Sequence, residues 1–348
     1  MNIIDCDVHP AWADPNEITK RLPVYFREAG GFGPVVTDWR NPFGFQRIDA
    51  RGPDGAEAGS SLDLLRTQLL DGFGITKGIL NASAQLQVGI NPHTDYANAY
   101  CRAFNDTLAE TWLAWDDRLF GAIMVAPQDP LAAAAEIRRV AATHRRFVQV
   151  IMTSATRIPL GQRFYWPIYE AACEVGLPVA VHPGQEGTGL ANGFIAGMPS
   201  TYLEWHTNLP QNYMGQIVSL VCEGVFEKFP KLRFVCVEGG LAWIPGVLWR
   251  LDKNWKALRS SVPWLKRLPS EYLVEHVRFT SQPSEEPPRS EQFLQLLEMI
   301  HADKTLMFSS DYPHWDNDDP HRAFPKLPPA LAERFFHANA EELYNFNR

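Results

Sequence analysis

Short apolar runs rich in β-branched and aromatic residues alternate with helix-length amphipathic segments along the whole chain. Eight such runs occur, each with the length of one buried strand. Strands that alternate with helices form parallel β-α-β units, and eight of these units close a barrel. The predicted strands cover residues 2–7, 75–81, 118–125, 147–152, 178–182, 232–238, 277–282 and 305–311.

The segments between the strands support the same fold. Helical spacing is clearest over residues 94–115, 130–144 and 164–176. Gly176 and Pro178 mark the end of the third of these helices and the start of the next strand. The alternative, an open doubly wound sheet, usually carries a glycine-rich phosphate-binding turn after its first strand. The sequence has HPAW there, so we predict a (β/α)8 TIM barrel formed by a single domain over residues 1–348.

Two stretches fall outside the repeating pattern. Residues 28–60 are rich in glycine and proline, and residues 184–211 form a second long irregular stretch directly after the fifth predicted strand. Long loops in compact domains tend to cover or line binding sites, and loops after barrel strands lie on the active face. We therefore expect both stretches to be insertions at the C-terminal face of the barrel.

Composition excludes several classes of partner and location. The formal net charge is -8 and no basic block occurs, which argues against nucleic acid as a partner. The five cysteines are widely spaced without a C-x-x-C pair, which is typical of reduced thiols in a cytoplasmic protein. No signal-peptide pattern and no run of about 18 apolar residues is present, so neither secretion nor a membrane span is predicted.

The first predicted strand ends in DCDVHP, with two carboxylates and a histidine at alternate positions. Because alternate residues of a strand point to the same side, Asp5, Asp7 and His9 share one face. Burying two acids and an imidazole together is unfavourable unless something neutralises them, and a cation would do so. Whether Asp5 lies inside the barrel as a supporting partner of Asp7 stays open from the sequence.

Other predicted strands also end in groups that bind metals. His182 ends the fifth strand, Glu238 the sixth and Asp311 the eighth. Chemistry in a TIM barrel lies at the carboxyl ends of the strands, so these side chains are expected to meet Asp7 and His9 at one mouth. Two imidazoles and two carboxylates suit Zn²⁺, Mn²⁺ or Fe²⁺. Such an ion lowers the pKa of a bound water toward about 7, which makes that water a nucleophile.

Five motifs along the chain extend this pattern: DCDVHP, VHPG, FPKLRFVCVEGG, SSDYPHWD and HANAEELYNF. Together they resemble the amidohydrolase superfamily, and more narrowly the amidohydrolase-2 group, which includes aminocarboxymuconate-semialdehyde and γ-resorcylate decarboxylases. The resemblance implies that Asp7, His9, His182 and Asp311 hold one divalent metal ion, Zn²⁺ or Mn²⁺. It also implies that Asp311 acts as acid and base. The lack of a lysine at the end of strand four fits a single metal, because relatives with two metals use a carbamylated lysine there.

The sequence departs from the decarboxylase pattern at strand six. The decarboxylases of this group have a catalytic histidine where this chain has Glu238, and Leu241 stands where the resorcylate type has a glutamate. Glu238 is therefore a candidate catalytic residue that could ligate a metal, act as a base or bind a substrate amine. A structural ion pair with a local arginine such as Arg250 is the alternative interpretation.

Further residues are expected at the mouth of the barrel. His314 closely follows the Asp311 strand end, and His206 lies in the long stretch after strand five. Trp12 and Trp315 could form an aromatic wall, with ordinary packing as the alternative. We predict that these four side chains bind substrate.

These observations lead to one principal functional hypothesis. The protein is expected to be a metal-dependent hydrolase of a small cyclic or aromatic carboxylated compound, acting through a metal-activated water, with Asp311 and Glu238 as catalytic groups. The alternative is a metal-dependent non-oxidative decarboxylase, in which Asp311 protonates carbon. A non-catalytic barrel that only binds a ligand is a third possibility, from another class. A homo-oligomer is implied by the resemblance, with a dimer as the simplest closed symmetry.

Overall fold

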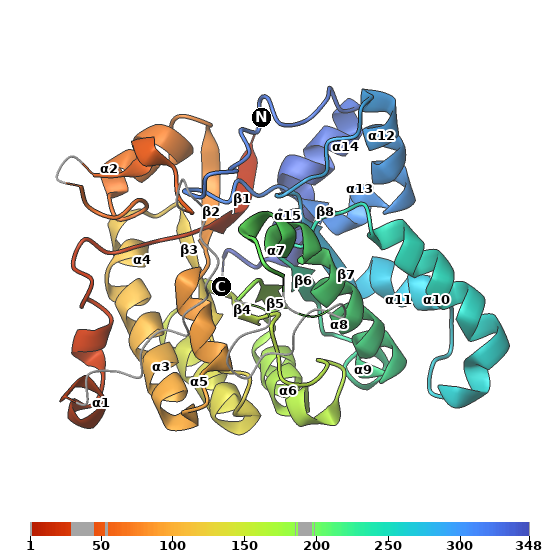
Figure 1. The fold of residues 1–348 in the computed structure, drawn as a ribbon, viewed down its shortest axis with the longest axis horizontal. Coiled ribbons are helices and arrows are strands. Elements are labelled where there is room, and N and C mark those ends of the chain that lie inside the picture. The colour runs from red at the N-terminus through yellow and green to blue at the C-terminus, as the bar shows by residue number, and fades with distance from the viewer. Residues whose placement is uncertain are drawn as a thin grey trace.

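The structure is a computed structural model that describes residues 2–28, 45–52, 55–184, 186, 197 and 199–347. Its centre is a sheet of eight parallel strands that pair in the order β1 to β8. The strands are β1 Ile3–Val8, β2 Ile75–Leu80, β3 Leu119–Met124, β4 Phe147–Thr153, β5 Val179–His182, β6 Phe234–Cys236, β7 Val277–Thr280 and β8 Leu306–Met307. Helices surround this sheet (Figure 1).

Backbone hydrogen bonds join the segment that begins at β8 to β1. The amide of Cys6 donates to the carbonyl of Phe308 over 3.0 Å, and the amide of Asp311 donates to the carbonyl of Asp7 over 3.0 Å. These bonds bring the last strand against the first, so the sheet curls into a nearly closed barrel. The predicted (β/α)8 TIM barrel is confirmed.

Helices connect the strands, and local sequence signals explain where several of them begin and end. Asp129 caps α5 by accepting a hydrogen bond from an amide of its first turn, and Gly176 ends α6 in the left-handed conformation. The helices are α1 Val24–Glu28, α2 Leu62–Leu65, α3 Thr94–Glu110, α4 Trp112–Trp115, α5 Pro130–Thr143, α6 Trp166–Val175, α7 Tyr202–Asn208, α8 Pro210–Cys222, α9 Val225–Lys228, α10 Ile244–Leu258, α11 Pro269–His276, α12 Ser290–Met299, α13 Ala302–Thr305, α14 Pro329–Glu333 and α15 Asn339–Leu343.

The structure differs from the sequence prediction at two places. Strand β8 is only two residues long, because the amide of Phe308 donates to the carbonyl of Phe335 and leaves the strand pairing. The stretch 184–211, expected to be irregular, contains α7 and the first two residues of α8. Parts of both predicted insertions, 29–44 with 53–54 and 185 with 187–196 and 198, lie outside the described residues.

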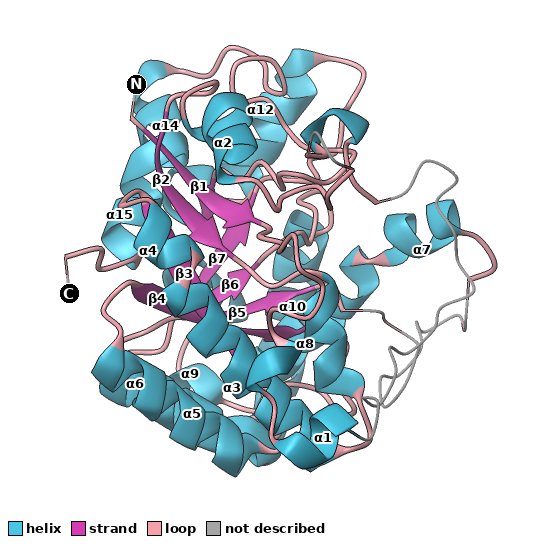
Figure 2. Cartoon of the chain, turned by 90° about the vertical axis from the view of Figure 1, so that its left-hand side faces the viewer, coloured by secondary structure: helices cyan, strands magenta, loops and turns pink. Residues whose placement is uncertain are grey.

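The carboxyl ends of the strands define the face on which the site lies. Figure 2 shows the strand arrowheads pointing toward the side of the molecule where α7 lies. The strands themselves are buried on both sides, which is the expected state of a parallel sheet covered by helices. Among the helices of the described residues, none has the length and apolar character required to cross a membrane.

Candidate metal centre

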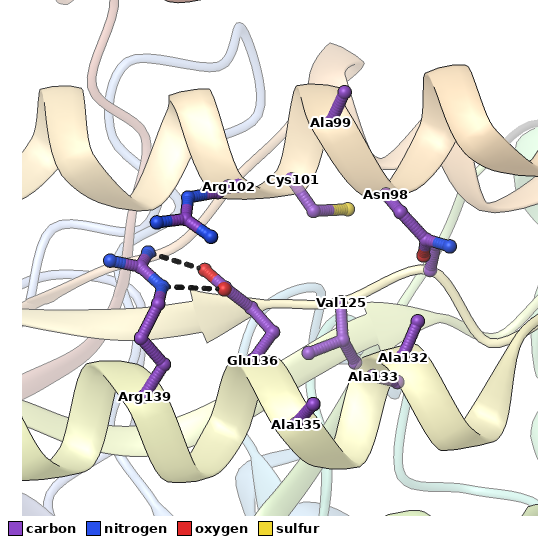
Figure 3. Close-up of a pocket in the computed structure, with 11 residues that line it drawn as sticks. Asn98, Ala99, Cys101, Arg102, Val125, Ala132, Ala133, Ala135, Glu136 and Arg139 are labelled. Atoms are coloured by element: carbon purple, nitrogen blue, oxygen red, sulfur yellow. Dashed lines mark hydrogen bonds and ion pairs between the residues drawn. The ribbon is translucent and has the colours of Figure 1, made fainter.

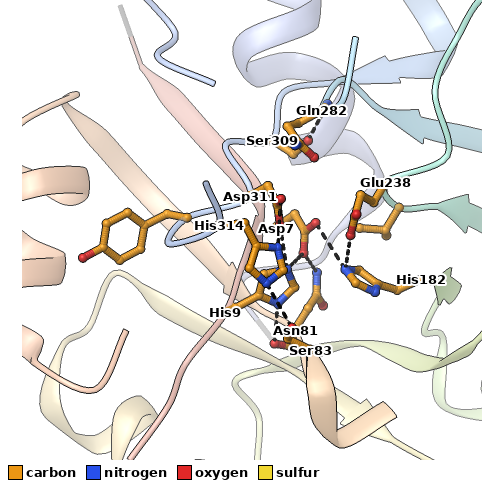
Figure 4. A network of polar contacts seen from close by, with 12 residues as sticks. Asp7, His9, Asn81, Ser83, His182, Glu238, Gln282, Ser309, Asp311 and His314 are labelled. Atoms are coloured by element: carbon orange, nitrogen blue, oxygen red, sulfur yellow. Dashed lines mark hydrogen bonds and ion pairs between the residues drawn. The ribbon is translucent and has the colours of Figure 1, made fainter. Parts of the chain in front are cut away.

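Five buried side chains meet at the carboxyl ends of β1, β5, β6 and the segment after β8. Each of them offers one possible ligand atom, and these atoms all lie within 4.8 Å of one another. The residues are Asp7, His9, His182, Glu238 and Asp311 (Figure 4). The sequence prediction that these strand ends converge therefore agrees with the geometry.

The local backbone aims two of the carboxylates into the cluster. Glu238 and Asp311 follow β6 and the β8 segment with φ angles of 59° and 64°, in the left-handed region that residues other than glycine rarely adopt. Such conformations cost on the order of 1 to 3 kcal/mol each and tend to occur at functional sites. The amide of Glu238 is held by the Thr280 hydroxyl over 3.1 Å.

Asn81, the residue after β2, contacts two members of the cluster. Its side-chain amide donates to Oδ1 of Asp7 over 2.8 Å, and its backbone carbonyl lies 3.1 Å from Nδ1 of His9. This contact places a proton on Nδ1, so that Nε2 of His9 faces the cluster. Nε2 lies 2.8 Å from Oδ1 of Asp311 and 3.5 Å from Oδ1 of Asp7.

His182 occupies the opposite side of the cluster. Its Nδ1 lies 2.8 Å from the carbonyl of Pro183, which again leaves Nε2 facing inward. Nε2 is 2.8 Å from Oε2 of Glu238 and 3.8 Å from Oδ2 of Asp7. Glu238 thus faces His182, whereas Arg250, its alternative partner from the sequence, lines a hollow between α8 and α10.

The cluster leaves polar atoms without hydrogen bonds. Oδ2 of Asp7, Nε2 of His182 and Oε2 of Glu238 are all buried, and none of them has a hydrogen-bond partner among the described residues. Nε2 of His182 and Oε2 of Glu238 are close enough for an ion pair, but their geometry does not meet that of a hydrogen bond. A buried polar atom without a partner is costly, and a divalent cation bound by imidazole and carboxylate ligands would satisfy all three. The residues present therefore fit a single metal ion.

The electrostatics of the cluster reflect its burial. Burial alone would lower the pKa of His182, but the Glu238 and Asp7 carboxylates outweigh it and raise that pKa to about 10. Burial also opposes protonation of His9, yet Asp7 and Asp311 raise its pKa. Burial raises the pKa of Asp311 to about 6, although its contact with His9 acts in the other direction. Without a metal ion, the neighbouring carboxylates thus favour the protonated form of both imidazoles.

A family model described as Amidohydrolase (Amidohydro_2) matches residues 4–346. The chain belongs to the amidohydrolase family. The match covers both the first strand and the final helices, and it confirms the resemblance that the five motifs carry.

Curated relatives of this amidohydrolase bear decarboxylase names. The gamma-resorcylate decarboxylase of Polaromonas sp. strain JS666 is 26% identical over 297 residues, which cover 81% of this chain and 87% of the relative. The enzyme of the same name from Rhodococcus jostii strain RHA1 is 27% identical over 263 residues, covering 72% of this chain and 76% of the relative.

Solved structures share the fold of this amidohydrolase. A dihydroxybenzoic acid decarboxylase from Polaromonas sp. JS666 with bound manganese and the inhibitor 2-nitroresorcinol has a TM-score of 0.70 at 21% identity, covering 100% of this chain and 98% of that one. A 5-carboxyvanillate decarboxylase from Novosphingobium aromaticivorans, complexed with manganese and 4-hydroxy-3-methoxy-5-nitrobenzoic acid, has a TM-score of 0.70 at 23% identity, covering 98% and 95%. Both of these neighbours carry manganese.

His314 lies directly beside the cluster. Its ring stacks on that of His9 with a centroid separation of 4.5 Å, and Nδ1 lies 2.9 Å from Oδ2 of Asp311. Burial and the neighbouring His9 lower the pKa of His314 to about 4. The ring is therefore neutral near pH 7, and its Nε2 faces the Ser83 hydroxyl at 3.1 Å.

Helix α7 brings His206 to the rim of the mouth. Nε2 of His206 lies 3.4 Å from Oδ2 of Asp316 and 3.9 Å from Oε1 of Glu238. Burial, followed by repulsion from Asp311 and Glu238, raises the pKa of Asp316 to about 7. Trp315 is 48% exposed, and its ring centroid lies 6.1 Å from that of His206. The structure thus places His206 and Trp315 together beside the cluster.

Trp12 has a different environment from the one expected. Its indole nitrogen donates to the Thr111 hydroxyl over 3.1 Å, and its ring packs edge-on against Phe104 of α3. The side chain is only 8% exposed and belongs to the hydrophobic core. The contacts of Trp12 with α3 fit the alternative left open from the sequence, ordinary packing, so we leave Trp12 out of the proposed substrate-binding residues.

Asp5 and Asn81 support the cluster without belonging to it. Asp5 lies fully inside the barrel and accepts hydrogen bonds from the amide and the hydroxyl of Ser310, at 2.9 and 2.5 Å. It also accepts from the amide of Asp7 over 3.1 Å, so it joins β1 to the segment that carries Asp311. Asn81 was missed from the sequence, although it is the last residue of the predicted second strand and carried the same strand-end signal as the metal-binding candidates.

A hollow of about 320 Å³ lies outside the barrel, between α3 and α5. Arg102, Glu136 and Arg139 point into it (Figure 3). Arg139 is already bound to Glu136 over 2.7 Å and to Asp106 over 2.8 Å. No member of the metal cluster lines this hollow, so we place the functional site at the barrel mouth.

Proposed function

We propose that this amidohydrolase is a metal-dependent, non-oxidative decarboxylase of a small aromatic carboxylic acid. The observation that carries the proposal is the buried cluster of imidazoles and carboxylates, in which three ligand atoms have no hydrogen-bond partner among the described residues. Relatives that align with most of the chain are named decarboxylases of aromatic acids. They favour the decarboxylase alternative over hydrolysis, the principal sequence hypothesis, for which they give no support.

The proposed metal ligands are Asp7, His9, His182 and Asp311, holding one Mn²⁺ or Zn²⁺ ion. Manganese in related structures and the mixed nitrogen and oxygen donor set support this assignment. When bound, the ion would supply positive charge that holds the carboxylate and a neighbouring hydroxyl oxygen of the substrate.

Asp311 is the proposed proton donor. As the bond between the ring and the carboxylate breaks, the electron pair stays on the ring carbon, which takes the proton from Asp311 while carbon dioxide leaves. Geometry supports this role, because both oxygens of the Asp311 carboxyl face the cluster, with Oδ1 2.8 Å from His9 and Oδ2 2.9 Å from His314, so the group lies where a bound substrate would react. His314 holds Oδ2 of Asp311 at 2.9 Å and thereby orients the carboxyl group.

The family resemblance implies a histidine at the position of Glu238, and we propose that His206 compensates for its loss. His206 of α7 lies 3.9 Å from Glu238 and brings an imidazole back to this side of the mouth. In the proposal, Glu238 contacts both His182 and the end of the substrate that reacts. The aromatic ring of the substrate and its substituents are bound by His206, His314 and Trp315. A wall of this kind combines apolar area with a few placed polar groups.

Two broader features belong to the same proposal. We place the enzyme in the cytoplasm, on the basis of its five widely spaced cysteines without a C-x-x-C pair. A homodimer is the proposed assembly, because cyclic dimers are the commonest closed form among soluble enzymes.

The direct test is a decarboxylation assay with metal control. Protein stripped with a chelator and reloaded with Mn²⁺ or Zn²⁺ is incubated with 2,6-dihydroxybenzoate, 5-carboxyvanillate and other hydroxybenzoic acids. We expect carbon dioxide release from at least one of these acids, lost on stripping and restored by metal. Hydrolysis of cyclic amides or lactones by the reloaded protein, without carbon dioxide release from any acid, would contradict the proposal.

A further inference from the structure

A continuous chain of hydrogen bonds crosses the barrel interior and ends at the metal cluster. The hydroxyl of Tyr344 donates to Oε1 of Gln149 over 2.9 Å, and Nε2 of Gln149 donates to Oδ1 of Asn81 over 2.7 Å. Nδ2 of Asn81 then donates to Oδ1 of Asp7 over 2.8 Å. All four side chains are buried, with at most 1% of each exposed. The chain therefore has no contact with solvent along its length.

The direction of these hydrogen bonds is fixed from the Asp7 end. An ionised Asp7 only accepts, and Nδ2 of Asn81 also donates to the carbonyl of Cys6 over 3.0 Å. Reversing the Asn81 amide would place its oxygen against both of these acceptors. Gln149 must then donate to Asn81, which turns its own oxygen toward Tyr344. The Tyr344 hydroxyl is the donor that completes the series.

Asn81 transmits this constraint to two proposed metal ligands. Its side chain occupies Oδ1 of Asp7, so that Oδ2 of Asp7 is left free to face the metal. Its backbone carbonyl lies 3.1 Å from Nδ1 of His9 and keeps Nε2 of His9 directed at the same place. Groups that orient metal ligands in this way tune metal affinity, because they restrict each ligand to its binding geometry.

We propose that Tyr344 is a positioning residue for the metal centre, acting on Asp7 through Gln149 and Asn81. This inference rests on the proposed metal-dependent function. It gives a role to the HANAEELYNF motif, which contains Tyr344 but contributes no residue to the metal cluster. The phenol ring alone could serve to pack the core against Phe346, whose ring centroid is 5.8 Å away, so the hydroxyl is the group that carries the proposal.

The experiment compares Tyr344→Phe with wild type by titrating metal-stripped protein with Mn²⁺ in a calorimeter. Losing a direct partner of a metal ligand typically weakens binding by about 10- to 100-fold, and Tyr344 acts two hydrogen bonds further away. We therefore expect the Kd for Mn²⁺ to rise by about 3- to 10-fold. Tyr169→Phe is the matched control, because Tyr169 is equally buried and its hydroxyl donates to the carbonyl of Leu160 over 2.6 Å, outside the chain.

Gln149→Met provides a second variant that removes the next link while keeping a similar volume. If both residues act through one chain, the double variant binds Mn²⁺ no more weakly than the weaker single variant. Equal Kd values for Tyr344→Phe, Tyr169→Phe and wild type would overturn the inference while leaving the metal site intact. A wild-type protein that binds neither Mn²⁺ nor Zn²⁺ would instead overturn the proposed function, and this inference with it. If Tyr344→Phe does not fold, an unchanged Kd in Gln149→Met overturns the proposal.

Discussion

Two buried aspartates in this protein have pKa values that move in opposite directions. Asp116, after α4, accepts hydrogen bonds from Arg118 over 2.9 and 3.0 Å and from Arg66 over 2.8 Å. The hydrogen bonds from Arg118, followed by the one from Arg66, hold the pKa of Asp116 well below its usual value despite its burial. Asp311, at the barrel mouth, has its pKa raised by burial.

The difference lies in the partners that the chain provides. Asp116 is paired with two guanidinium groups that are always charged. In the described part of the chain, no lysine or arginine forms an ion pair with Asp7, Glu238 or Asp311, whose ion-pair partners are histidines. An acid with a permanent cation beside it strengthens the fold, whereas acids gathered without one are suited to receive a cation from solution.

Replacing Asp311 tests the functional half of this comparison and should give the largest effect. Asp311→Asn keeps the shape but removes both the negative charge and the transferable proton. We expect kcat/KM for decarboxylation to fall by at least about 10³-fold, since proton transfer by a positioned group contributes about 10² to 10⁴-fold and a metal ligand is weakened as well. Steady-state kinetics check this, with circular dichroism to confirm folding. A variant that keeps a tenth of the activity would remove Asp311 from the proposed mechanism.

Replacing Asp116 tests the structural half. Asp116→Asn should lower the free energy of unfolding by about 1 to 3 kcal/mol, because hydrogen bonds to charged groups are lost or weakened. Urea denaturation measures this change, and activity below the denaturation range should match wild type. The lowered pKa of Asp116 means that its contribution is present above its unfolded value of 3.8 and is lost as the pH falls through the lower folded value. The difference between variant and wild type should therefore shrink in strong acid.

The pH dependence of metal binding sharpens the comparison further. His182 has a pKa raised to about 10, so below that pH it holds a proton that a metal must displace. The affinity for Mn²⁺ should rise with pH between about 6 and 8, by up to about tenfold per unit for each proton released. Calorimetric titration in buffers of different ionisation enthalpy counts these protons. An affinity that is independent of pH would show that His182 is neutral before the metal binds.

The smallest effect on catalysis is expected from substitutions of Trp315 and His206 at the rim of the barrel mouth. Trp315→Ala should raise KM by a few fold, about 1 kcal/mol for a partly exposed aromatic contact, with little change in kcat. His206→Gln is the companion variant, because it removes the imidazole beside Glu238 and Asp316. If His206 acts on the substrate beside Glu238, its loss lowers kcat more than Trp315→Ala does. Equal effects on KM alone would limit both residues to binding.

The sequence predicted the parts of this molecule that depend on short-range pattern. Asp7, His9, His182 and Asp311 follow or end apolar strands, and parallel strands bring such positions to one face whatever the loops do. For His206, the sequence predicted only that it lies in the long stretch after strand five and hence near the mouth. Its contacts with Glu238 and Asp316 could not be predicted, because the orientation of α7 depends on tertiary packing. The environment of Trp12 could not be predicted. An aromatic residue near a strand end can face the barrel mouth or pack on a neighbouring helix, and no local sequence pattern distinguishes the two.

His9 and Asp311 are separated by 302 positions in the sequence, yet their side chains are 2.8 Å apart. The proposed metal ion would therefore bridge the seam at which the last strand meets the first. A partly folded chain whose barrel has not closed offers Asp7 and His9 but not Asp311, and so has only a fraction of the affinity. Because a ligand that binds only the complete site stabilises that state by mass action, metal supply would favour the final step of barrel closure during folding.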